Sequence, residues 1–147
     1  MSGSQRKPIT TKEAPGPYPP LSQAMVHGGF VFCSGSIGMN PQTNSIVEGT
    51  IADRTVSEHS MVLDEIHGNN MFQTQALTNL SKVLEAAGSG ADKILKVNIY
   101  VTSMEDVPLM NEAYMAFFAE PRPARACVCV KALARGTDVE IECTGFI

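Results

Sequence analysis

The chain has 147 residues, of which 44% are hydrophobic, and this length is enough for one hydrophobic core but short for two. The formal net charge is −4 at pH 7, and Lys and Arg do not cluster beyond Arg6 and Lys7, so we expect no nucleic-acid partner, because binding several phosphates requires a concentrated basic face. No apolar run reaches membrane-spanning length and the N-terminus lacks a secretory-signal stretch, so we expect no membrane partner and a soluble, cytoplasmic protein, with the mitochondrion as the second choice of compartment.

Residues 1–20 are expected to form an extended, flexible lead, because the segment 14–20 contains four prolines. A single domain is expected from residue 21 to residue 147. It begins with two β-prone runs, 24–27 and 30–35, which are joined by two glycines. That pattern is typical of a β-hairpin with a two-residue turn.

Two helices and a strand are predicted in the middle of the chain. Apolar residues between 75 and 87 recur on one helical face, and Gly88 then provides a left-handed stop. Residues 94–102 are rich in β-branched side chains and are predicted to form a strand. Asp106 is expected to cap the second helix, with Pro108 in its first turn.

Two further strands are predicted at 124–131 and 137–146, which gives the order ββ-α-β-α-ββ. This order favours an α+β sandwich, with two helices on one face of a mixed sheet. Several alternate residues of the last strands are too apolar to face water. They are Cys127, Cys129, Ile141 and Cys143. We therefore expect the second face of the sheet to pack against copies of the same chain.

The four cysteines do not form the C-x-x-C spacing of a redox pair or of half a zinc site. We interpret them as small packing residues and predict no metal site. Cys127 lies two residues after Arg125, so a thiol role is the alternative, but neither Cys127 nor Cys129 is assigned as a nucleophile.

Arg125 is the most informative residue, because it lies among small apolar residues of a predicted strand. If the last two strands pair as a hairpin, Arg125 lies close to Glu140 and Glu142. One interpretation is a carboxylate-binding guanidinium beside a general base, which predicts a small anionic substrate. The other is a cross-strand ion pair with no further role.

Short segments over nearly the whole chain match the motifs of a known family. They are Ser22-Gln23-Ala24, residues 30–35, Val47-Glu48-Gly49, residues 84–88, Lys96-Val97-Asn98, Asn111-Glu112-Ala113-Tyr114, Pro123-Ala124-Arg125 and residues 139–142. In these segments the chain resembles the Rid family (YjgF, reactive intermediate deaminase, historically endoribonuclease L-PSP), and it looks closest to the fungal members. The resemblance implies a chorismate-mutase-like fold and a homotrimer, with the sheets forming a barrel and the active sites lying between subunits.

The resemblance also implies hydrolytic deamination of 2-imino or 2-enamino acids to 2-keto acids and ammonia, without any cofactor. The substrates of such a 2-iminobutanoate/2-iminopropanoate-type deaminase arise from pyridoxal-phosphate dehydratases. On this basis Arg125 binds the substrate carboxylate and Glu140 positions and deprotonates water. Ser34, Gly35 and Cys127 provide further hydrogen bonds around the substrate. Spacing alone does not separate Glu140 from Glu142, and the family pattern selects Glu140.

Two departures from the family pattern stand out. Leu21 occupies a pocket-lining position that is usually tyrosine, and the nearest tyrosine, Tyr18, comes three residues earlier. Either Tyr18 loops back or the hydroxyl is missing, and its loss is expected to reduce activity or favour bulkier, apolar imines. Residues 56–73 form an insert, which we interpret either as a retained intron or as a genuine surface insertion.

Two other functions compete with imine hydrolysis. A non-catalytic sensor or chaperone-like protein would use Arg125 to bind small carboxylates without turnover. The historical endoribonuclease activity is the least favoured, because the chain is acidic and has no basic stripe.

Overall fold

A computed structural model describes residues 5–55 and 75–147. The insert at 56–73 lies outside the described residues, so its origin stays a hypothesis. The helices are α1 (Ile51–Thr55), α2 (Ala76–Ala86) and α3 (Val107–Phe117). The strands are β1 (Lys7–Ile9), β2 (Ala24–His27), β3 (Phe30–Cys33), β4 (Ser36–Ile37), β5 (Ile94–Val101), β6 (Ala124–Cys129) and β7 (Val139–Phe146). Short 3-10 turns occur at Ala91–Lys93, Met104–Asp106 and Ala134–Gly136.

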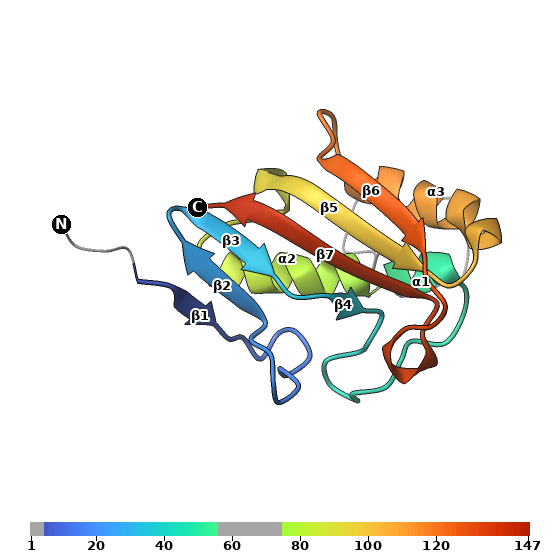
Figure 1. Ribbon diagram of the computed structural model, residues 1–147, viewed down its shortest axis with the longest axis horizontal. Coiled ribbons are helices and arrows are strands. Elements are labelled where there is room, and N and C mark those ends of the chain that lie inside the picture. The colour runs from blue at the N-terminus through green and yellow to red at the C-terminus, as the bar shows by residue number, and fades with distance from the viewer. Residues whose placement is uncertain (1–4, 56–74) are drawn as a thin grey trace, which may run out of the picture.

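The described strands form one mixed sheet with the order β1-β2-β3-β7-β5-β6, and β4 pairs separately with β7. Only the pairing of β5 with β6 is parallel. The predicted hairpin between the last two strands is therefore wrong, because β5 lies between β6 and β7 (Figure 1). β5 is an internal strand of the sheet, in agreement with its alternate side chains Val97, Ile99 and Val101, which are fully buried.

The three helices cover one face of the sheet, which confirms the α+β class (Figure 1). Leu77, Leu80 and Leu84 of α2 are buried there against the sheet. Ile141 and Cys143 also point into this core, and Cys127 and Cys129 pair with Ile99 and Val101 on the same face. The prediction that these four residues lie on an open face is therefore wrong.

The apolar residues of the open face are different ones. Phe30 and Phe32 alternate with buried Val31, and they pair with Phe146 and Thr144 of β7. Val128 of β6 pairs with Tyr100, whose side chain also lies on that face. The large apolar side chains left exposed there are Phe30, Phe32, Val128 and Phe146.

The predicted hairpin turn and helix end agree with the structure, but β1 and β4 were not predicted, and β1 pairs with β2 within the segment expected to be a flexible lead. Gly28 and Gly29 have φ values of 59° and 80°, as the two-residue hairpin turn requires, and Gly88 ends α2 with φ 82°. Asp106 precedes α3 but makes no capping hydrogen bond, and Ser103 instead accepts one from the amide of Glu105. The short helix α1 was not predicted.

Candidate active site

A cavity of about 770 Å³ lies between the N-terminal lead, β4, the start of α2 and β7. Four of the six predicted site residues line it. They are Leu21, Ser34, Gly35 and Glu140. The sequence therefore predicted residues that the fold brings together from three separate segments of the chain.

Glu140 provides the carboxylate of this cavity. Its side chain is half-buried, and burial, followed by the charge of Glu142, raises the pKa of the Glu140 carboxyl above its usual value. Within residues 5–55 and 75–147 we find no hydrogen-bond or ion-pair partner for it. Gly35 lies directly against it, since a Cβ added at Gly35 would overlap Oε1 of Glu140. The glycine therefore leaves room for the carboxylate.

Glu142 has a different environment, although it lies on the same face two residues later. Its Oε1 accepts hydrogen bonds from Nδ2 of Asn98 at 2.9 Å and from the hydroxyl of Tyr100 at 3.0 Å. The second of these bonds is the main cause that raises the pKa of Tyr100. The Glu142 carboxylate is therefore hydrogen-bonded to its neighbours on β5, whereas the Glu140 carboxylate has no partner among the described residues and can interact with a bound molecule.

Gln23 holds the N-terminal lead against the domain. Its side chain is buried and accepts a hydrogen bond from the amide of Thr11 at 2.6 Å. It donates two others, to the carbonyls of Thr11 at 3.1 Å and Pro15 at 2.8 Å. The hydroxyl of Ser34 donates to the carbonyl of Ser22 at 2.7 Å, so Ser34 retains only acceptor capacity toward a ligand. Sequence reasoning missed Gln23, although a buried amide beside a proline-rich segment is a typical anchor.

Tyr18 and Leu21 both line the cavity, because the chain reverses between them at Pro19 and Pro20. The amide of Leu21 donates to the carbonyl of Tyr18 at 3.0 Å, which closes this turn. Tyr18 therefore loops back to the cavity, one of the two alternatives that the sequence left open, although its side chain is 70% exposed.

Arg125 and Cys127 lie elsewhere. Arg125 pairs in register with Val97 and faces the helices, whereas Glu140 pairs with Tyr100 on the open face. In one chain the two predicted catalytic residues are thus separated by β5 and point to opposite faces of the sheet. Cys127 is half-buried on the Arg125 side, and burial raises the pKa of its thiol, which favours the protonated form.

Residues of α3 hold the Arg125 side chain. Its Nη1 donates to Oδ1 of Asn111 at 2.7 Å, and its guanidinium lies 4.8 Å from the centre of the Tyr114 ring. Asn111 and Tyr114 were left out of the predicted site. Their spacing of three residues is the feature of the sequence that could have indicated them, because it places both side chains on the helix face that meets β6.

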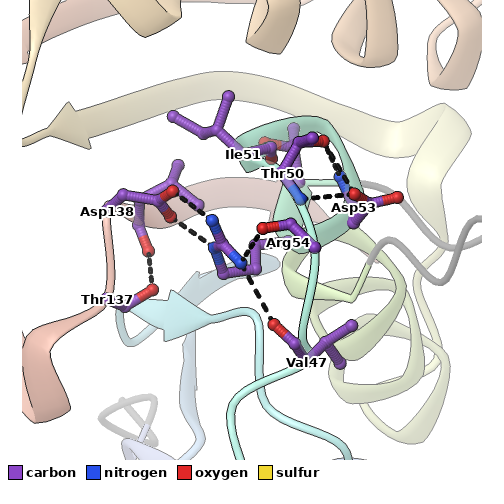
Figure 2. A network of polar contacts seen from close by, with 10 residues as sticks. Val47, Thr50, Ile51, Asp53, Arg54, Thr137 and Asp138 are labelled. Atoms are coloured by element: carbon purple, nitrogen blue, oxygen red, sulfur yellow. Dashed lines mark hydrogen bonds and ion pairs between the residues drawn. The ribbon is translucent and has the colours of Figure 1, made fainter.

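A clamp of polar contacts fixes α1 to the start of β7 (Figure 2). Nε of Arg54 donates to Oδ1 of Asp138 at 2.6 Å, and Nη2 pairs with Oδ2 of the same carboxylate. Nη1 donates to the carbonyls of Val47 at 3.2 Å and Gly49 at 2.8 Å. The clamp therefore holds the residue that lies two positions before Glu140.

The described part of the chain contains no group of three or more His, Cys, Asp or Glu side chains placed to hold a metal ion. None of its helices combines the length and the hydropathy that a membrane span requires.

The mixed sheet with helices on one face and a cavity beside β4 and β7 defines a small α+β domain. Residues 11–147 match the model of the endoribonuclease L-PSP family. The chain belongs to this family, whose structures include those called Rid proteins.

Two relatives illustrate the similarity. A 2-iminobutanoate/2-iminopropanoate deaminase of Dermatophagoides farinae is 37% identical over 139 residues, covering 95% of this chain and 94% of the relative. The mitochondrial protein mmf1 of Schizosaccharomyces pombe is 36% identical over 146 residues, covering 95% of this chain and 75% of the relative.

Two solved structures show the same fold. A Rid-family protein from Yersinia pestis has a TM-score of 0.82 at 33% identity, with 97% of this chain and all of that one covered. TdcF from E. coli, solved with bound serine, has a TM-score of 0.77 at 29% identity, with 96% and 98% covered.

Proposed function

We propose that the protein hydrolyses 2-imino and 2-enamino acids to 2-keto acids and ammonia. The observation that carries this proposal is Glu140, a half-buried carboxylate without a partner among the described residues, in a cavity that also contains Ser34 and Gly35. The relatives named as deaminases of 2-iminobutanoate and 2-iminopropanoate, and the serine bound by TdcF, support a small amino-acid-derived substrate.

Arg125 binds the substrate carboxylate through its guanidinium. Asn111 and Tyr114 orient that guanidinium, and the side chain is exposed enough to offer its remaining N–H groups to a ligand. Because Arg125 and Glu140 lie on opposite faces of one sheet, a complete site requires Arg125 from one copy of the chain and Glu140 from another. The exposed Phe30, Phe32, Val128 and Phe146 favour burial of the open face in a homotrimer of this kind.

The reaction adds one water to the C=N bond. Glu140 removes a proton from water while the oxygen attacks the imine carbon, and the C=N electron pair moves to nitrogen, which takes up a proton. Glu140 returns the proton that it removed from water to the nitrogen, and the hydroxyl proton of the tetrahedral intermediate then passes to the amine as the C–N bond breaks, ammonia leaves and the C=O bond forms. Ser34 accepts a hydrogen bond from the substrate, and the Cys127 thiol remains a weak donor rather than a nucleophile.

The test is keto-acid release in a threonine or serine dehydratase reaction to which the purified protein is added. Wild-type protein should accelerate release, and Arg125→Ala should abolish the acceleration. Arg122→Ala is the matched control, because Arg122 is a nearby exposed arginine that pairs with Glu120.

The other outcomes distinguish the competing functions. Carboxylate binding by folded protein without any acceleration would favour the non-catalytic binding protein. RNA cleavage that survives Arg125→Ala and requires Glu140 would favour the endoribonuclease.

A further inference from the structure

We propose that the cavity beyond Glu140 is a subsite for a long apolar side chain, so that the preferred substrates are branched or aromatic 2-imino acids rather than three- or four-carbon ones. This inference rests on the proposed function and names the substrate class of the same site.

The size of the cavity is the first argument. At about 770 Å³ it falls in the range of about 300–1,000 Å³ that holds drug-sized ligands. A three-carbon imino acid placed at Glu140 would fill only a small part of the space that this chain lines. A substrate with a longer side chain would displace water from that space and bury apolar surface.

The walls are the second argument. Away from Glu140 they are formed mainly by apolar side chains of the lead, of β4 and the loop that follows it, and of α2. They include Pro17, Leu21, Ile37, Met39, Leu80 and Val83. The turn at Pro19 and Pro20 brings Tyr18 and Leu21 to the same wall, which encloses the space from the side of the lead.

The buried polar side chains of the cavity, those of Gln23 and Asn79, are the third argument, because both already have partners in the protein. The Gln23 side chain forms hydrogen bonds with residues of the lead, and the Ser34 hydroxyl donates one to the carbonyl of Ser22. Nδ2 of Asn79 donates to the carbonyl of Met39 at 2.9 Å, and its Oδ1 accepts from Gln75. These two buried amides are therefore not available to select a polar side chain, and discrimination in the buried part of the cavity falls to apolar contact.

Arg135 is the group that would favour the opposite specificity. It lines the cavity, is exposed, and uses one Nη1 donor on the carbonyl of Asn44 at 3.1 Å. A substrate with a second carboxylate would reach this guanidinium, so acidic imines must be part of the test.

The experiment compares 2-imino acids formed in situ from alanine, leucine, phenylalanine and glutamate by an amino-acid oxidase with catalase, with semicarbazide as the competing trap. We expect kcat/KM for the leucine and phenylalanine imines to exceed that for the alanine imine by at least about tenfold. Ala134→Trp, which places an indole at an exposed lining position, should remove most of that difference. Ala132→Trp is the control, since Ala132 is exposed in the same connection but does not line the cavity.

Preference for the alanine imine, or for the glutamate imine, would overturn the inference while leaving the proposed function intact. If wild-type protein hydrolysed no imine, the proposed function would fail. In that case the rise in Tm caused by 4-methyl-2-oxopentanoate tests the subsite independently of activity. Stabilisation greater than that by pyruvate, and lost in Ala134→Trp, would support it, and equal effects would overturn it.

Discussion

At the scale of single residues, the two glutamates of β7 show how environment separates chemically identical groups. Glu142 accepts two hydrogen bonds from β5, whereas the Glu140 carboxylate faces the cavity without a partner among the described residues. Burial without compensating donors disfavours the charged form, so Glu140 is held at some cost in stability. A residue kept in an unfavourable state is typical of catalytic groups.

Glu140→Gln should therefore abolish activity and stabilise the fold at pH 7. A carboxyl with a raised folded-state pKa binds more protons when folded, so stability is highest below the ordinary value of 4.5 and falls as pH rises through the raised value. Removing the charge should raise Tm by roughly 1–3 °C, because a gain below about 1 kcal/mol shifts a domain of this size by a few degrees. Thermal melts at pH 7 and pH 4 measure the effect, which should shrink at pH 4.

Glu142→Gln is the matched control, and it should not gain stability because it weakens the hydrogen bonds from Asn98 and Tyr100. An equal rise in Tm for both variants would contradict the assigned difference between the two carboxylates.

The same raised pKa predicts the acidic limb of the pH–rate profile. Glu140 acts as a base only when ionised, so kcat/KM should fall with decreasing pH at a higher pH than an ordinary glutamate would give. Steady-state rates between pH 4 and pH 8 test this, with the imine-forming enzyme in excess at each pH so that it does not limit the rate, and with the uncatalysed hydrolysis subtracted. A limb at or below pH 4.5 would exclude Glu140 as the base.

At the scale of elements, the site depends on two attachments, one for the lead and one for α1. Gln23 fixes residues 11–15 through three hydrogen bonds, and Arg54 fixes the start of β7 through Asp138. Both join segments that lie far apart in the sequence. These polar anchors therefore fix the cavity wall on the side of the lead and the loop before β7, while pairing with β4 and β5 places Glu140.

Gln23→Leu should release the lead without unfolding the domain. The substitution keeps the volume but removes the partners of Thr11 and Pro15, so local opening becomes easier. Amide exchange of Thr11 should accelerate by about tenfold or more, since a loss of about 1.4 kcal/mol changes the opening equilibrium tenfold. Gln42→Leu, at an exposed loop position, should leave that exchange rate unchanged.

Arg54 and Asp138 should show strong coupling in a double-mutant cycle. Their side chains are 14% and 23% exposed, so the pair is shielded from water. Urea unfolding of Arg54→Met, Asp138→Asn and the double variant should give a coupling energy of about 1.5–3 kcal/mol, the range for hydrogen bonds to charged groups. Strictly additive losses would show that the clamp contributes no pairwise stability.

At the scale of the whole molecule, the separation of Arg125 from Glu140 predicts subunit complementation. Mixed oligomers of inactive Arg125→Ala and inactive Glu140→Gln chains contain some sites with both native residues, provided that these come from different copies. An equal mixture of the two variant chains is unfolded and refolded together. About a quarter of the wild-type activity should return, because each site receives a native Arg125 and a native Glu140 independently from two different chains.

Each variant refolded alone is the control and should remain inactive. Restoration would fail entirely if one chain supplied both residues. Light scattering of the wild type should give three times the mass of one chain, and Phe32→Glu, which places a charge on the open face, should lower that mass.

The sequence by itself determined most of the longer elements and the alternation of side chains along each strand. Period-two runs and the Gly28-Gly29 turn predicted β2 and β3, the 3.6-residue period predicted α2, and the family motifs selected Leu21, Ser34, Gly35 and Glu140, which meet in one cavity. Only the tertiary structure decided that β5, and not β6, pairs with β7. Alternation along a strand specifies which residues share a face, but the choice of neighbouring strand depends on burial across the whole sheet. The buried Val97, Ile99 and Val101 favour an internal position for β5, and its registers with β6 and β7 place Arg125 and Glu140 on opposite faces.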